Sequence, residues 1–214
     1  MKINFYMFLC IDTTSSVAGV TIIGKKPVYI KIDPYHASEK IIGIIDEALK
    51  KSGAELKDLE GVFVIKGPGS FTGLRVGIAV ANQFAHQLKV PITGLKTEEW
   101  WGNRTDEKGF VYLQTMNKSE IYISHFAFRI SDSHSIIPVD ELSGKKLWLG
   151  ELSDEHRQKL PSGFKEITGL LSPEKTWTKI IQSTYYLQPT TYNLVEPYYG
   201  KEPTITKSKK KLSI

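Results

Sequence analysis

The residues whose spacing is most suggestive of chemistry are the glycines of Gly67-Pro68-Gly69-Ser70, between an apolar segment and a helical pattern. A glycine-rich turn that feeds a helix can aim backbone N–H groups at an anion such as phosphate. A Walker-type loop and the dinucleotide fingerprint would each need a further glycine at position 72, which is Thr72. The turn is therefore predicted to serve close packing, because glycine lets neighbouring backbones approach.

Other nucleophiles and metal ligands have little support in the sequence. The five histidines show no i, i+4 pair or other spacing typical of metal ligands, so no metal site is expected. Cys10 stands inside an apolar run, where a buried thiol is unreactive. Ser70 lacks the G-x-S-x-G context of a nucleophile elbow. Nucleophilic catalysis is not predicted.

The elements that would position these residues alternate in a recognisable order. Strands are expected at 5–11, 17–23, 28–32, 62–65 and 90–95, with helices at 39–51 and 71–88. This order resembles one lobe of the actin-like ATPase (ASKHA, ribonuclease H-like) fold. Further strands at 110–115, 121–130, 135–139 and 145–149, then a helix from Pro173 to about Leu187, indicate a worn copy of that lobe.

The predicted fold class is therefore α/β, with two lobes of mixed sheets flanked by helices. We expect an N-terminal lobe over 1–99, a degenerate C-terminal lobe over 100–204 and a flexible basic tail over 205–214. Trp100-Trp101 marks either the boundary between the lobes or an exposed patch.

The predicted helix 71–88 is apolar nearly all round, so it should be buried on two sides. Small residues recur every fourth position on one face, and a partner helix could approach such a stripe to about 8 Å between axes. The helix 39–51 is expected to lie beside it. The predicted partner interface comprises Ile41, Ile45, Leu49, Gly73, Leu74, Arg75, Gly77, Ile78, Ala81 and Ala85.

The run GPGSFTGLR-x-G over 67–77, with Ile11-Asp12-Thr13-Thr14-Ser15-Ser16 upstream, resembles the TsaB (YeaZ) family. The resemblance is good over residues 9–100 and weak over 101–190. It implies a non-catalytic subunit required for N6-threonylcarbamoyladenosine modification of tRNA. Such a subunit binds and activates a TsaD-like transferase through a helical interface, pairs with itself when alone, and has a TsaE-like ATPase as a possible further partner.

Two enzymatic alternatives remain. One is an ATP-dependent phospho- or carbamoyl-transferase of the same fold, with Asp12, Thr13 and Thr14 as a phosphate loop. That chemistry needs a second, opposed acidic turn for Mg²⁺, and the matching turn 116–119 has no carboxylate. We therefore expect Asp12 to be a vestige that bonds nearby backbone N–H groups, with no cofactor. The other alternative, an M22-type glycopeptidase, lacks its histidine ligands.

Composition sets further bounds. The chain of 214 residues is 41% hydrophobic and 24% charged, as in ordinary globular proteins. Of its net charge of +5, the lysines of 207–211 contribute four, and this tail is a candidate for weak contact with tRNA. One cysteine fits a reducing compartment, and no run approaches the roughly 20 apolar residues of a membrane span. A cytoplasmic protein without a membrane partner is predicted.

Overall fold

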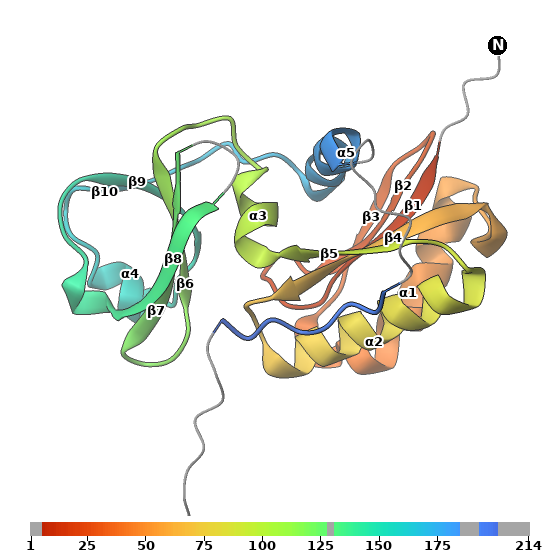
Figure 1. Cartoon of the computed structure of the whole chain (residues 1–214), viewed down its shortest axis with the longest axis horizontal. Coiled ribbons are helices and arrows are strands. Elements are labelled where there is room, and N and C mark those ends of the chain that lie inside the picture. Colours follow the sequence, from red (N-terminus) through yellow and green to blue (C-terminus); the bar gives the residue numbers. More distant parts are fainter. Residues whose placement is uncertain (1–5, 128–130, 185–192, 201–214) are drawn as a thin grey trace, which may run out of the picture.

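The computed structural model describes residues 6–127, 131–184 and 193–200. These form two five-stranded sheets, side by side and flanked by helices (Figure 1). The first sheet and its helices comprise β1 (Met7–Asp12), β2 (Gly19–Ile23), β3 (Val28–Lys31), α1 (Ala37–Ser52), β4 (Leu59–Gly67), α2 (Phe71–Leu88), β5 (Ile92–Lys96) and α3 (Thr97–Gly102). The second part comprises β6 (Phe110–Thr115), β7 (Glu120–Phe126), β8 (Ser131–Pro138), β9 (Lys146–Glu151), α4 (Asp154–Gln158), β10 (Phe164–Glu166) and α5 (Pro173–Thr184). Short 3₁₀ turns cover Pro34–His36, Leu56–Asp58 and Val139–Glu141.

Both sheets have the same topology. The first has the order β3-β2-β1-β4-β5, with an antiparallel β1–β2–β3 meander and with β4 and β5 added in parallel. The second has the order β8-β7-β6-β9-β10, again with an antiparallel meander and two parallel strands. This repeat confirms the predicted α/β actin-like fold and its worn second copy.

The first sheet is covered on both faces. In Figure 1, α1 and α2 lie on one face and α5 lies on the other. Successive side chains of a strand point to opposite faces, so Leu9 and Ile11 of β1 pack toward α1 and α2, whereas Phe8 and Cys10 enter the cluster that includes α5. Burial on both faces explains why β1 and β4 read as continuous apolar runs.

Tryptophans fill the joint between the two sheets. Trp100 and Trp101 of α3 and Trp177 of α5 are 1%, 4% and 2% exposed. The ring centre of Trp100 lies 5.7 Å from that of Trp101 and 6.1 Å from that of Trp177. The suggestion that Trp100-Trp101 forms an exposed patch is therefore wrong. The alternative, a boundary position, agrees with α3, which connects the last strand of the first sheet to the second sheet (Figure 1).

Several predicted ends differ from the structure. The first long helix begins at Ala37, two residues before its predicted start, and the predicted strand 121–130 ends at Phe126. The strand expected at 135–139 begins earlier, at Ser131. Residues 185–187 of the predicted last helix and the tail 205–214 lie outside the described residues. In the part of the chain that the structure describes, no helix is both long and apolar enough to cross a bilayer.

Candidate functional site

The turn after β1 is held together by one carboxylate. Oδ1 of Asp12 accepts hydrogen bonds from the backbone N–H and the hydroxyl of Thr14, at 2.8 and 3.0 Å, and from the N–H of Ser15 at 3.3 Å. Its Oδ2 accepts from the hydroxyl of Ser15 at 2.5 Å. Asp12 is only 3% exposed, and it has the backbone-bonding turn role that the sequence predicted.

The matching turn of the second sheet is built in the same way around an amide. Asn117 lies between β6 and β7, and its Oδ1 accepts from the N–H groups of Ser119 and Glu120, both at 2.9 Å. Asn117 organises the turn after β6 as Asp12 organises the turn after β1, although Asp12 is the last residue of its strand and Asn117 lies two residues beyond its own. The Asn117 side-chain amide also donates to Oε2 of Glu120 at 2.5 Å, so the carboxylate next to this turn is bonded within it.

A carboxylate from the second sheet binds the backbone next to the Asp12 turn. Glu151, at the end of β9, accepts a hydrogen bond from the backbone N–H of Ser16. Burial raises the pKa of the Glu151 carboxyl above its ordinary value, and the nearby Asp12 carboxylate raises it further. Arg104 lies near both acids and packs over the ring of Trp101, with 4.6 Å from its Cζ to the ring centre.

These contacts do not fit an ATP–Mg²⁺ site. The Asp12 carboxylate is engaged by its own turn, and the N–H of Ser16, which could face a phosphate, is taken by Glu151. Within the described ranges, no three His, Cys, Asp or Glu side chains gather closely enough to hold a metal ion. Glu151 could not be found from local sequence patterns, because the contact joins residues 135 positions apart.

A second carboxyl, also missed from the sequence, is buried where the two sheets meet. Glu98 of α3 is 0% exposed, and its Oε1 accepts from the hydroxyl of Tyr122 at 2.8 Å. Lys96 Nζ lies 3.9 Å from the same oxygen, whereas Oε2 has no hydrogen-bond partner. Burial is the largest influence on this group and raises its pKa above the ordinary value of 4.5.

The glycines of the turn 67–70 and of α2 make room for the chain's own backbone. A Cβ on Gly73 would lie 2.2 Å from the carbonyl oxygen of Thr13, and one on Gly77 would lie 2.3 Å from Thr13 Oγ1. A Cβ on Gly69 would lie 2.8 Å from Cβ of Thr14. The Thr13 hydroxyl also donates a 2.7 Å hydrogen bond to the carbonyl of Gly73. The glycines of the motif thus allow α2 to pack closely against the turn that contains Asp12.

The predicted partner stripe on α2 packs against its own chain. Six of its predicted interface residues are buried here: Gly73, Leu74, Gly77, Ile78, Ala81 and Ala85. Gly73 and Gly77 admit the turn after β1, and contact of this stripe with a partner stays a prediction. Among the predicted α2 residues only Arg75 is exposed, and its guanidinium carbon lies 4.0 Å from the ring centre of Phe71.

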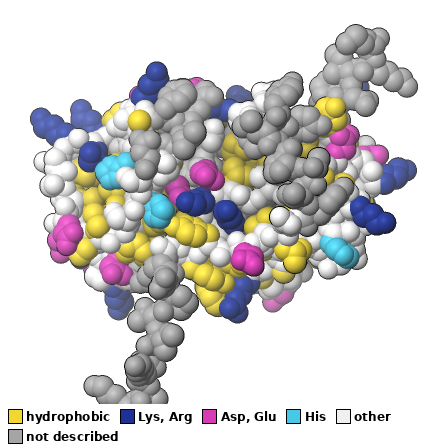
Figure 2. Space-filling model, in the orientation of Figure 1, with side chains coloured by type: hydrophobic (Ala, Val, Ile, Leu, Met, Phe, Trp, Pro, Cys, Tyr) yellow, Lys and Arg dark blue, Asp and Glu magenta, His cyan; other side chains and the backbone are white. Residues whose placement is uncertain are grey.

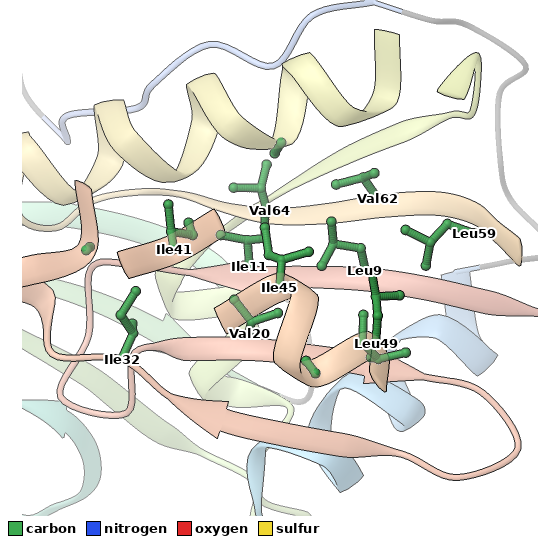
Figure 3. Close-up of a cluster of buried hydrophobic side chains, with 14 of the residues drawn as sticks. Leu9, Ile11, Val20, Ile32, Ile41, Ile45, Leu49, Leu59, Val62 and Val64 are labelled. Carbon is green, nitrogen blue, oxygen red and sulfur yellow. The ribbon is translucent and has the colours of Figure 1, made fainter. Parts of the chain in front are cut away.

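The α1 residues of the predicted interface also pack inward in this structure. Figure 3 shows Ile41, Ile45 and Leu49 pointing toward the strand side chains of the first sheet, and they are 1%, 1% and 5% exposed. They belong to the core of this lobe, because an apolar stripe on an amphipathic helix normally covers its own sheet.

The outward side of the two helices nevertheless carries apolar surface. Ile42 of α1 is 56% exposed and Leu56 is 43% exposed, while Phe84 of α2 is half-buried. These residues line a groove of about 470 Å³ between the helices, and Ile45 and Leu49 contribute to its floor. The rest of its lining is Asp46, Lys50, Ala54 and Glu55. We call this groove, with its charged rim, the helical groove.

An aromatic group stands near the start of α2. Phe71 is 53% exposed and stacks on Tyr199, with ring centres 5.2 Å apart. Figure 2 shows hydrophobic side chains at the surface in this part of the molecule, beside a basic side chain. Phe71 lies on α2, which also supplies Phe84 to the helical groove, whereas the Asp12 side chain is buried.

Comparison with known proteins agrees with the motif. A family model described as TsaD: tRNA N6-adenosine threonylcarbamoyltransferase matches residues 33–110. The tRNA threonylcarbamoyladenosine biosynthesis protein TsaB of Buchnera aphidicola subsp. Schizaphis graminum is 36% identical over 93 residues, which are 42% of this chain and 44% of that protein. The TsaB of Escherichia coli K12 is 31% identical over 91 residues, 42% of this chain and 39% of that one. Over these stretches the chain is similar to proteins of the TsaB (YeaZ) family.

The fold of this chain has a counterpart over nearly its whole length. A crystal structure from Pseudomonas aeruginosa, of an uncharacterized protein with similarity to peptidase YEAZ, covers 92% of this chain and 100% of that chain. Its TM-score is 0.75 at 16% identity, which establishes a shared fold. By sequence, the chain spans less than half the length of the two TsaB relatives it matches. The range matched by the family model, 33–110, includes the glycine motif and α2.

Proposed function

We propose that this chain is a non-catalytic subunit that supports threonylcarbamoyladenosine modification of tRNA by binding a TsaD-like transferase. Curated relatives that match it are named as biosynthesis proteins of that modification, which supports the process. The partner is proposed from the family resemblance. It would bind through the helical groove and the exposed side of α2.

The helical groove is the observation that carries this proposal. It places Ile42, Leu56 and Phe84 at the surface between α1 and α2, with Asp46, Lys50 and Glu55 also in its lining. An apolar centre with a polar rim is the usual anatomy of a protein interface. A helix with apolar residues at helical spacing fits a groove of this kind. A second copy of this chain would occupy it when no transferase is present.

A supporting rather than catalytic role rests on the two turns. The carboxylate of Asp12 is engaged within its turn, Glu151 takes the N–H of Ser16, and the second turn is organised by the Asn117 amide, to which Glu120 is bonded. We therefore propose that no ATP–Mg²⁺ is used by this chain. The activity of the assembly would belong to the transferase.

The proposed binding site is tested by introducing a charged side chain into the helical groove. Ile42→Glu changes an exposed residue, so the fold should persist, while a buried carboxylate without a partner would weaken transferase binding by at least 100-fold. Affinity is measured by titration calorimetry with the transferase of the same host. The threonylcarbamoyladenosine content of tRNA is measured by mass spectrometry in cells that carry only the variant.

Tyr35→Glu is the matched control, because Tyr35 is 93% exposed and is absent from the groove lining. Tyr35→Glu should bind the transferase with wild-type affinity, and cells that carry it should have the wild-type content of threonylcarbamoyladenosine in tRNA. If Ile42→Glu binds as tightly as Tyr35→Glu, the groove is not the docking site. If both bind normally and tRNA modification is unaffected by deleting the chain, the proposed process itself is wrong.

A further inference from the structure

Residues 193–200, which we call the strap, form an extended segment without helix or strand. Figure 1 shows the strap running along α2, close to β4 and β5. Each of its eight residues is half-buried or exposed, so the strap contributes no fully buried side chain to the core. Its contacts with the body are nevertheless specific, and they play no part in the function proposed above.

The body recognises the strap chiefly through its backbone. The side-chain amide of Asn82 on α2 donates to the carbonyl of Val195 and accepts from its N–H, both at 2.9 Å. Farther along, the N–H of Tyr198 donates to the carbonyl of Lys66 at 2.7 Å. Lys66 lies at the irregularity between Ile65 and Gly67 where the β4–β5 register shifts. These bonds are made to the strap backbone, so they do not themselves depend on its side chains.

Two glycines of the body shape the surface under the strap. A Cβ on Gly94 of β5 would lie 2.6 Å from Cγ1 of Val195. One on Gly67 would lie 2.0 Å from the carbonyl oxygen of Tyr198. Real Cβ atoms do not approach neighbours this closely, so both positions need to lack a side chain for the strap to dock. This surface, together with Asn82 and the Lys66 carbonyl, is the strap seat.

Aromatic contacts add side-chain preference at the far end. The ring of Tyr199 stacks on Phe71, and the hydroxyl of Tyr198 lies 2.9 Å from Nε2 of His134 on β8. Lys96 Nζ lies 4.9 Å from the ring centre of Tyr198. The seat therefore favours a branched apolar residue at the position of Val195 and aromatic residues three and four positions later.

Ordering an extended segment costs conformational entropy at every residue. The strap offsets this cost with four hydrogen bonds and with side chains that are at most half-buried. Segments with few buried contacts open at lower free energy than the core. The strap should therefore leave its seat without unfolding of the two sheets.

We propose that the strap seat is a peptide-binding groove that residues 193–200 fill in cis, and that an extended peptide of the same chemistry occupies it in trans when the strap is released. Asn82 is the positioning residue of this groove. The proposal is independent of the helical groove and of the transferase.

Hydrogen exchange on the full chain tests release. In the wild type, the amides of Val195 and Tyr198 should exchange faster than that of Val62, which bonds to the carbonyl of Pro91 in the body. Asn82→Ala should speed exchange of both strap amides at least tenfold and leave Val62 unchanged. Gln83→Ala, at the exposed neighbouring position, should change none of them. The proposal would be overturned if the strap amides and Val62 exchange at equal rates. It would also be overturned if Asn82→Ala leaves the exchange rates of the strap amides unchanged.

Peptide binding tests the groove itself. The full chain with Val195→Asp and Tyr199→Asp keeps the seat but loses the side chains that hold the strap. It should bind a labelled peptide with the sequence of residues 193–200 at least ten times more tightly than the wild type, whose seat is occupied. Adding Gly94→Ala, which places a Cβ under the Val195 position, should abolish that gain. Equal binding by the three chains, or no binding by any, would refute a groove.

Discussion

Gly73→Ala should destabilise the isolated chain, although alanine is the better helix former. The added Cβ would lie 2.2 Å from the carbonyl oxygen of Thr13, which is backbone and cannot rotate away. Overpacking of this kind costs about 1–3 kcal/mol. Displacing Thr13 also weakens its 2.7 Å hydrogen bond to Gly73, worth about 1 kcal/mol. The helix gains up to ~1 kcal/mol in return.

The net loss is therefore about 2 kcal/mol, which lowers the melting temperature of a chain of this size by about 4–8 °C. Urea unfolding followed by circular dichroism measures it directly. Gly43→Ala is the matched control, because Gly43 lies within α1, is exposed, and a Cβ there meets nothing within 4 Å. Gly43→Ala should leave the free energy of unfolding unchanged or raise it by up to ~1 kcal/mol. If Gly73→Ala and Gly43→Ala are equally stable, the glycines of α2 do not serve close approach to the turn after β1. The hypothesis that the stripe contacts a partner would then be favoured.

Two further predictions concern the joint between the sheets. Trp177→Ala should cost about 3–5 kcal/mol in urea unfolding, since Trp177 is 2% exposed and packs near Phe63 and Trp100; a loss below 1 kcal/mol would mean that the sheets are joined elsewhere. Glu98→Gln should change the pH dependence of stability. Burial raises the folded-state pKa of Glu98 above 4.5, so its contribution is fully present below the unfolded pKa and is lost as pH rises through the folded one. Urea titrations between about pH 4 and pH 8 should show wild-type stability falling relative to the variant, and parallel curves would exclude a titrating Glu98.

Local signals in the sequence were sufficient for α2. Its predicted bounds, 71–88, agree with the structure because the signals are strong. Ser70 caps the first turn by accepting from the N–H of Gly73 at 3.3 Å, and the helix ends before Lys89 in the left-handed conformation. The first sheet was equally predictable, since its strands are continuous apolar runs separated by turn residues. The six-residue α3 was missed because it is too short to show a period.

The face of α2 could not be assigned in the same way. Periodicity shows which residues share a side of a helix, but it does not show what covers that side. Thr13 is 60 positions from Gly73, and only the parallel pairing of β1 with β4 brings its turn to the start of α2. Glu151 reaches Ser16 because the two sheets lie side by side, with β9 next to β6 in the second sheet. Both contacts follow from topology, which a single sequence does not encode locally.

The distribution of indole rings gives the molecule a built-in optical reporter. Three of the four tryptophans, at positions 100, 101 and 177, share the cluster between the sheets, and Trp148 belongs to a separate cluster that includes Val111 and Leu113. In a Trp148→Phe chain, tryptophan fluorescence would come only from the joint between the sheets. Its emission wavelength and quenching by iodide would then follow any parting of the two halves in real time, without an attached dye.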